Sequence, residues 1–308
     1  MIRDIYPDRA STPFKGVFRV CQPRWRKTQK GADFLVTNLV DVSGGITAYG
    51  WDGKYDGPRD LVDLERVEIV ATSRIFNGTT ICDIMSVERS DSGNPLDLIP
   101  STFTLNQDLV HSLSRLIDML AIPALRDFVE GVMNDDRLFL PFLQVPGSAR
   151  HHHCEPTGLF RHSIECATMV SNMLDLHGPE RELAIVAALF HDIGKVRCFD
   201  VTGKRSITGY VMDHDNLTLE MLAHHLAVLD EVWPDGGVAL RYLLTWKQGN
   251  RKFSVPLLTV AEAITSADRL SSGLDRERQI FRDAPKWRRF VRTSPNTLYW
   301  RPRMAINC

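Results

Sequence analysis

The spacing of hydrophobic residues changes once along the chain. Up to about residue 90, apolar and polar residues alternate in short runs such as "ADFLVTNLVDV" and "ITAYGW", and this period of two is typical of half-buried strands. Beyond that point, apolar residues recur at three- and four-residue intervals in longer runs, which is the period of helices that bury one face. The pattern predicts an α+β protein with a strand-rich N-terminal part and a helical C-terminal part.

The N-terminal part contains five strand-like runs. "GVFRVCQPRW" precedes the two runs already quoted, and "VEIVATSRIF" and "TTICDIMSV" are joined by Asn77-Gly78, a strong hairpin signal. Five short strands are the number expected for a small closed barrel of the OB type. The stretch "RSDSGNPLDLIPS" then has the composition of a linker. We therefore expect an OB-type barrel at residues 1–90, a linker at 91–108 and a helical domain at 109–308.

Composition narrows the class of protein. The chain has 308 residues, 44% of them hydrophobic, and a formal net charge of -1, so only local patches would attract nucleic acid. Its six cysteines include no C-x-x-C pair, which is typical of reduced thiols in the cytosol. Charges interrupt the N-terminus, and no run approaches the ~20 apolar residues that a membrane helix needs. We expect a cytoplasmic protein without a membrane partner.

The predicted barrel contains one local patch that could attract nucleic acid. Tyr49 and Trp51 share one face of a strand, and the stretch "RVCQPRWRKTQK" surrounds another tryptophan with cations. Aromatic rings that stack on bases, beside cations that follow phosphates, suit single-stranded nucleic acid. The alternative is that the rings belong to the barrel core and the cations to a solvated loop. The candidate nucleic-acid-binding residues are Arg24, Trp25, Arg26, Lys27, Tyr49 and Trp51.

The helical part concentrates potential metal ligands. Of ten histidines, nine lie between His151 and His225. Imidazole and carboxylate ligands together suit zinc, manganese, iron or nickel. Asp268 follows Ile264 by one helical turn on a mostly apolar face, and a buried carboxylate needs a cation. A single histidine on such a helix is usually a core or capping residue, but the whole set favours a metal site.

The order of these residues resembles a known superfamily. His162, then His191-Asp192, then Asp268, on successive helices, resembles the HD superfamily of metal-dependent phosphohydrolases. Two branches of this superfamily are similar to the chain. In YhaM-type 3′ to 5′ exoribonucleases an OB barrel precedes the HD domain, and in the TraI-like domain of MobH-type conjugative relaxases "HHHCEPTGLFRHS" and "AALFHDIGKVR" have counterparts. The resemblance covers residues 138–273 by motif and the barrel by architecture only.

The resemblance implies a site and an activity. It implies one divalent ion, of manganese, iron, nickel, zinc or magnesium, with the ligands His162, His191, Asp192 and Asp268. Lys195 would meet a phosphate oxygen, and His214 would bind a second metal or a phosphate, so that Lys195, His214 and Asp192 would be the catalytic residues. The implied function is a metal-dependent phosphodiesterase or nuclease that acts on single-stranded DNA or RNA.

The chain departs from this pattern in "LLTWKQGN". The exonuclease relatives have a histidine pair there, whereas Trp246 offers no lone pair and Lys247 carries a positive charge. We therefore predict one tightly held metal ion per chain and a slower enzyme, or one that nicks. The runner-up is a nucleic-acid-binding module of a mobile-element transfer system, with other conjugation proteins as partners and a weakened or silent HD site. A nucleotide phosphohydrolase is less favoured, because a small substrate gives the barrel little to do.

Two segments keep both of their interpretations. The histidines at 151–153 either form a polar loop or include an outer contact or general acid of the metal site, with His152 or His153 favoured for that role. The segment 275–304 interleaves arginines with aromatic residues, which suits either a nucleic-acid strand or a tail packed on the helical domain. The sequence leaves open whether the substrate is DNA or RNA, whether cleavage is exonucleolytic or endonucleolytic, and which oligomeric state the protein has.

Overall fold

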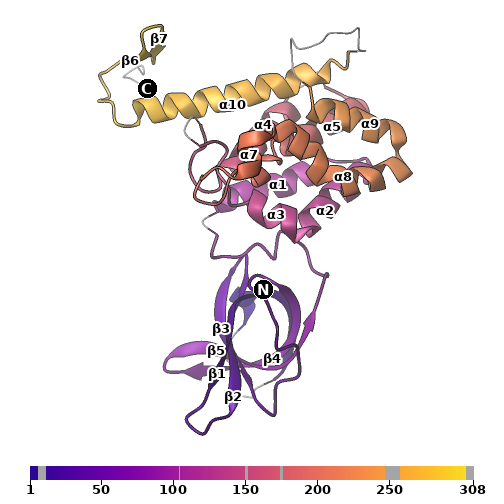
Figure 1. The fold of residues 1–308 in the computed structure, drawn as a ribbon, viewed down its shortest axis with the longest axis vertical. Coiled ribbons are helices and arrows are strands. Elements are labelled where there is room, and N and C mark those ends of the chain that lie inside the picture. The colour runs from indigo at the N-terminus through magenta and orange to yellow at the C-terminus, as the bar shows by residue number, and fades with distance from the viewer. Residues whose placement is uncertain (6–11, 104, 150–151, 174–175, 247–256, 303–308) are drawn as a thin grey trace. The chain divides into compact units, whose positions relative to one another are not determined.

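The computed structural model describes residues 1–5, 12–103, 105–149, 152–173, 176–246 and 257–302. The chain divides into two compact units, Met1–Val110 and His111–Cys308, shown in Figure 1. Among the described residues, no helix combines the length and the apolar character needed to span a bilayer.

The first unit is a closed five-stranded barrel. A short 3₁₀ helix, η1 (Ile2–Asp4), precedes the strands β1 (Phe14–Lys27), β2 (Asp33–Asp41), β3 (Gly44–Trp51), β4 (Arg66–Phe76) and β5 (Thr79–Arg89). Their order around the barrel is β1-β2-β3-β5-β4, and β1 closes on β4. Neighbouring strands are antiparallel except β3 and β5, which are parallel. The predicted α+β fold with an N-terminal barrel is confirmed.

Side-chain alternation determines which residues fill the barrel. Leu35 and Leu39 on β2 are buried, while Phe34 and Val36 between and beside them are only partly so. The hairpin from β4 to β5 turns at Asn77-Gly78, where both residues have positive φ, 48° and 79°. Positive φ at both central positions is what the predicted tight hairpin turn requires.

Part of the segment expected to be a linker packs on the barrel. Leu98 and Ile99 are buried, and the backbone N–H of Val42 donates to the carbonyl of Asp97 (2.9 Å). The fully buried side chain of Arg19 donates from Nε to the carbonyl of Leu98 (2.7 Å). This arginine ties the chain after β5 to the barrel wall, so it is not available to a ligand.

The second unit is mainly helical. Its elements, including the helix that begins at the end of the first unit, are α1 (Gln107–Asp118), α2 (Pro123–Asn134), α3 (Asp136–Phe142), α4 (Gly158–Ser171), α5 (Gly178–Phe190), α6 (Lys195–Cys198), α7 (Ile207–Val211), α8 (His214–Val232), α9 (Pro234–Leu244), α10 (Val260–Arg282), β6 (Phe290–Ser294) and β7 (Thr297–Trp300). Helices α4, α5 and α10 pack against one another, and α10 is the long yellow helix of Figure 1. These three helices carry the predicted metal ligands or end next to them.

The C-terminal hairpin pairs its aromatic rings with each other. Phe290 and Trp300 stack at 6.4 Å, and the guanidinium of Arg289 lies over both rings. Trp287 and Trp300 remain 78% and 53% exposed. The exposed rings do not match a tail that buries its aromatics against the helical domain.

Candidate metal centre

The four predicted ligands come from three helical elements. His162 lies in the second turn of α4, His191 and Asp192 directly follow the buried end of α5, and Asp268 lies in α10. Nε2 of His162 is 3.2 Å from Oδ1 of Asp268 and 3.5 Å from Oδ2 of Asp192. Nε2 of His191 is 3.5 Å from the same Asp192 oxygen. The structure therefore brings two imidazoles and two carboxylates together.

His191 presents a lone pair to this group. Its Nδ1 lies 2.8 Å from the carbonyl of Ala188, which only accepts, so Nδ1 carries the proton and Nε2 does not. Within the described residues, the buried Nε2 has no hydrogen-bond partner. Because an acceptor buried opposite carboxylate oxygens is costly, the arrangement calls for a cation.

A serine orients His162 in the same way. The hydroxyl of Ser271 donates to Oε2 of Glu165 (2.7 Å), so Ser271 must accept from Nδ1 of His162 at 3.0 Å. The Nε2 lone pair of His162 then faces Asp268. Metal-bound histidines usually donate their second ring N–H to such a partner. The residues present thus fit a divalent ion held by two nitrogens and two carboxylates.

Electrostatics keep these groups in the protonation states that a cation needs. Burial would raise the pKa of Asp192, but the ammonium of Lys195, with His191 and His214, holds that pKa well below its usual range. Nζ of Lys195 is 2.5 Å from Oδ2 of Asp192. Burial lowers the pKa of His191, which keeps its ring neutral. An ionised carboxylate and a neutral imidazole are the ligand forms that bind a metal.

His214 lies at the edge of the centre, at the start of α8. Its Nε2 is 3.1 Å from Oδ1 of Asp192 and 3.1 Å from Oδ1 of Asp215. Burial alone would lower the pKa of His214, but the hydrogen bond and charge of Asp192 outweigh it and raise that pKa. Gly194 permits this approach, since a Cβ there would lie 2.0 Å from the carbonyl oxygen of His214.

The centre opens into a cavity of about 350 Å³. Its lining includes His191, Asp192, His214, Asp268 and Trp246. Lys247, the other residue at which the chain departs from the exonuclease pattern, lies outside the described residues. The volume falls within the range of small-ligand sites.

Sequence comparison agrees with this geometry. Residues 159–273 match the HD domain family, a range that contains all four predicted ligands. The helical unit contains an HD domain. The similarity to the HD superfamily is therefore confirmed.

Curated relatives also resemble the chain outside this range. A 3′-5′ exoribonuclease YhaM from Oceanobacillus iheyensis is 24% identical over 227 residues, which cover 71% of this chain and 67% of that protein. The YhaM exoribonuclease of Bacillus subtilis is 20% identical over 254 residues and that of Listeria innocua 23% over 264, each covering 80% of both chains. The similarity thus extends beyond the HD domain.

Several residues around the HD centre contact the predicted ligands without belonging to that set. Nε2 of His153 lies 3.1 Å from the Ser271 hydroxyl and His153 is fully buried, while His152 lies beside His162 with ring centroids 5.8 Å apart. This agrees with outer contacts of the site; His151 lies outside the described residues. The Cys166 thiol is 3.7 Å from Nε2 of His162, and burial raises its pKa so that it stays protonated. Ser271 follows Asp268 by one turn of α10, a signal that the sequence did contain.

On the barrel, strand register sorts the candidate nucleic-acid-binding residues by face. One row across the outer wall is Arg26, Phe34 and Trp51, and the next contains Arg24 and Tyr49 with a valine between them. The three rings are close: Phe34 and Trp51 stack at 5.2 Å, and Tyr49 and Trp51 at 5.5 Å. These rings are outside the barrel core, which answers the alternative that the sequence left open.

The remaining two candidate nucleic-acid-binding residues are Trp25 and Lys27. Trp25 pairs with the inward-facing Leu35, its indole N–H donates to the carbonyl of Arg59 (2.9 Å), and the Arg59 guanidinium lies 4.6 Å from its ring centre. Its ring is therefore covered and is not part of the outer rows. Lys27 is exposed and pairs with Asp33 at 3.0 Å. Phe34 takes the place among the outer rings that was expected of Trp25.

Proposed function

We propose that this chain is a metal-dependent phosphodiesterase that cleaves single-stranded nucleic acid at its HD centre. The observation that carries the proposal is the buried Nε2 of His191, which has no partner among the described residues and faces the oxygens of Asp192. His162 and Asp268 complete a set of four groups suited to one divalent ion.

Each group of the HD centre has its own role in the proposed reaction. A bound divalent ion would supply Lewis-acid stabilisation and an activated water. Lys195, whose ammonium lies beside the Asp192 carboxylate, would bind a phosphate oxygen as a point charge. His214 is partly exposed at the edge of the cavity, with its Nε2 against Asp192, and its imidazolium charge would attract another oxygen of the same phosphate.

The barrel favours a strand over a free nucleotide as substrate. The outer rows of stacked rings and exposed arginines offer contacts to several successive bases and phosphates. The names of the YhaM relatives favour RNA and exonuclease action. The relaxase-like form of the hypothesis, with its transfer partners, has no support among these relatives and stays a prediction from sequence.

The test is a parallel assay of the full chain loaded with metal. Labelled single-stranded RNA, single-stranded DNA, their duplexes and free nucleotides are compared, with Asp192→Ala as the inactive reference. We expect cleavage of single strands, RNA above DNA, and affinity that increases with length. Hydrolysis of free nucleotides alone would contradict the proposal.

The number of ions is tested separately. Elemental analysis of protein purified without chelator should find about one divalent ion per chain, because Trp246 offers no further ligand at the cavity wall. Two stoichiometric ions would contradict this expectation. No ion under metal-replete conditions would instead favour a binding module with a silent HD site.

A further inference from the structure

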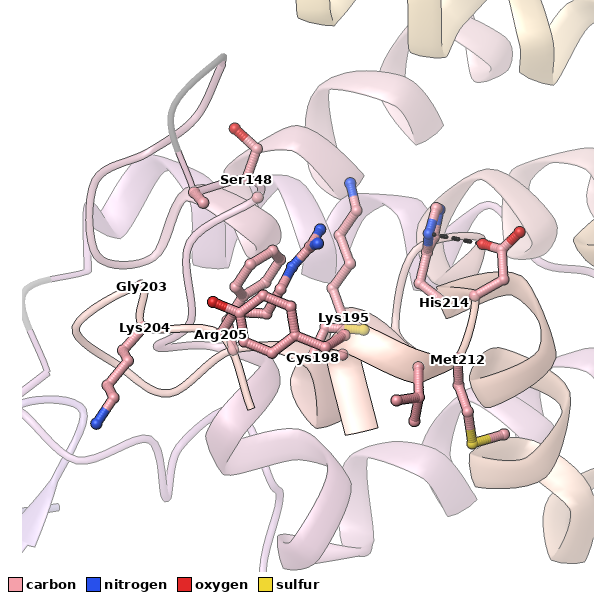
Figure 2. A pocket seen from close by; sticks show the side chains of 15 residues that line it. Ser148, Lys195, Cys198, Gly203, Lys204, Arg205, Met212 and His214 are labelled. Atoms are coloured by element: carbon pink, nitrogen blue, oxygen red, sulfur yellow. Dashed lines mark ion pairs between the residues drawn. The ribbon is translucent and has the colours of Figure 1, made fainter. Parts of the chain in front are cut away.

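A second and larger cavity lies next to the metal centre. It measures about 890 Å³ and shares Lys195 and His214 with that centre (Figure 2). The two cavities meet at His214, which lines both. The two cavities are therefore neighbours on either side of one histidine, close enough for successive units of one strand.

Local hydrogen bonds give the larger cavity a defined wall. The Asp200 carboxylate accepts from the backbone N–H groups of Thr202 (2.9 Å) and Lys204 (3.0 Å), which closes the tight loop before Arg205. Ser206 then caps α7 by accepting from the backbone N–H of Gly209 (2.9 Å). The wall is therefore a hydrogen-bonded turn followed by a capped helix.

The chemistry of this wall is cationic and aromatic. The Arg205 guanidinium lies 5.5 Å from the ring centre of Tyr210 and 5.7 Å from that of Phe199. Tyr210 is 73% exposed, so one face of its ring is open to a ligand. Within the described part of the chain, Arg205 forms no ion pair.

Arg205 and Lys195 serve the same side of the cavity. Figure 2 shows both side chains extending in one direction, whereas Lys204 extends away from them. Both cations also act on one thiol: burial raises the pKa of Cys198, and the charges of Arg205 and Lys195 oppose that rise. A polyanion that passes the metal centre would meet Lys195 first and Arg205 next.

We propose that this cavity is the subsite for the nucleotide next to the scissile phosphate, with its base on Tyr210 and its phosphate on Arg205. The inference rests on the proposed function, because it takes the metal centre as the place of cleavage. Three features select a nucleotide: a cation without an ion pair among the described residues, an exposed ring held beside it, and a lining residue, His214, shared with the metal cavity. A free peptide or an apolar ligand would use only part of this set.

Binding without cleavage provides the first test. The affinity of single strands of two to eight nucleotides is measured in chelator for the full-length wild type, Tyr210→Ala, Tyr210→Phe and Arg205→Ala. We expect Tyr210→Ala to bind about 5- to 150-fold more weakly and Tyr210→Phe to bind like the wild type, since stacking needs only the ring. Arg197→Ala removes an equal charge from α6 outside the cavity, where Arg197 pairs with Glu220, and should change affinity little.

Abasic scanning then locates the contact. One base at a time is deleted along the strand, and the wild type should lose affinity most at one position near the cleaved end. In Tyr210→Ala, deletion of the base at that position should no longer change the affinity, whereas deletions at the other positions should have the same effect as in the wild type. The subsite would be overturned if Tyr210→Ala and the wild type had equal affinity and the same abasic profile. It would also be overturned if no base deletion near that end changed the affinity of the wild type.

A substrate without a neighbouring nucleotide separates this inference from the proposed function. Methyl p-nitrophenyl phosphate carries a methyl group where the strand would continue, so Tyr210→Ala should hydrolyse it as the metal-loaded wild type does. If the wild type cleaves this diester and strands but shows no Tyr210-dependent position, the subsite is wrong and the function stands. If the wild type cleaves neither, yet the abasic position depends on Tyr210, the proposed function fails and the binding subsite stands.

Discussion

The barrel and the helical unit hold their candidate functional side chains in opposite ways. On the barrel, Arg24, Tyr49 and Trp51 lie on an outer wall where each side chain meets solvent. In the HD centre, His162 and Asp192 are buried and face other predicted ligands across 3.2 to 3.5 Å. The barrel side chains face solvent, whereas the buried groups of the HD centre would share their lone pairs with one cation.

This difference predicts two kinds of response to mutation. Exposed stacking and phosphate contacts contribute separately, so each loss should be modest and nearly additive. Buried groups that share one ion and one hydrogen-bond network depend on each other, so the loss of one ligand should remove the site. Variants in the two units should therefore affect different measurements.

The largest effect is expected from Asp192→Ala. Its carboxylate contacts His162, His191, His214 and Lys195, so the variant should lose both the bound metal and hydrolysis. Affinity for single strands in chelator should stay within about twofold of wild type, because the barrel rings are untouched. Metal analysis and strand titration check this.

The matched control is Asp230→Ala, which removes a carboxylate of the same unit that pairs with Arg241 at 2.7 Å. It should keep its metal. If Asp192→Ala retained full metal and full activity, the HD centre would not be the site.

Lys195→Ala should separate binding of the metal from the rate of cleavage. The variant keeps all four proposed ligands, so it should retain the ion, but it loses the charge that would meet phosphate. We expect kcat to fall about 10²- to 10³-fold, the usual cost of one charge-stabilising group. Metal content and kcat measured on the same preparation distinguish the two roles of Lys195. If the variant lost the ion, Lys195 would position Asp192 and would not act only on phosphate.

Ser271→Ala should weaken the metal without abolishing the site. The Ser271 hydroxyl orients His162 through a 3.0 Å contact and is not itself a ligand. Removal of such a partner typically costs about 10- to 100-fold in metal affinity. A metal titration should show this shift, with hydrolysis restored at saturating metal. Unchanged affinity would mean that the α4 helix alone holds the ring.

Trp51→Ala should affect the other unit only. Loss of one stacking ring should weaken single-strand binding by about 1–3 kcal/mol while metal content and small-diester hydrolysis stay the same. Trp25→Phe is the control, because the ring of Trp25 is covered by Arg59 and is outside the outer rows. Equal losses in both variants would show that the outer face is not the binding surface.

The smallest effects are expected from Arg24→Ala and Arg26→Ala. Each exposed arginine would release about one counterion on binding, so each variant should flatten the plot of log affinity against log salt by about 0.7 for a single strand. Lys27→Ala should change the slope less, because Lys27 already pairs with Asp33. Slopes that do not change for either arginine would place the phosphate contacts elsewhere.

Local patterns were enough to predict the architecture and the four side chains that meet at the HD centre. Alternation predicts the barrel strands, Asn77-Gly78 predicts one hairpin, and the order of His162, His191-Asp192 and Asp268 predicts the HD centre. These features depend on neighbours in sequence or on ligand types at characteristic spacings, which survive without knowledge of the fold.

Contacts between distant residues were decided only by the tertiary structure. Strand register places Phe34 beside Trp51 and turns Trp25 inward, although Trp25 lies between two outward-facing arginines. Ser271 reaches His153 across 118 residues of sequence, and the cavity of Arg205 lies beside the metal centre only because α6, α7 and α8 pack together. No local period encodes such proximities, because they follow from the packing of whole strands and helices.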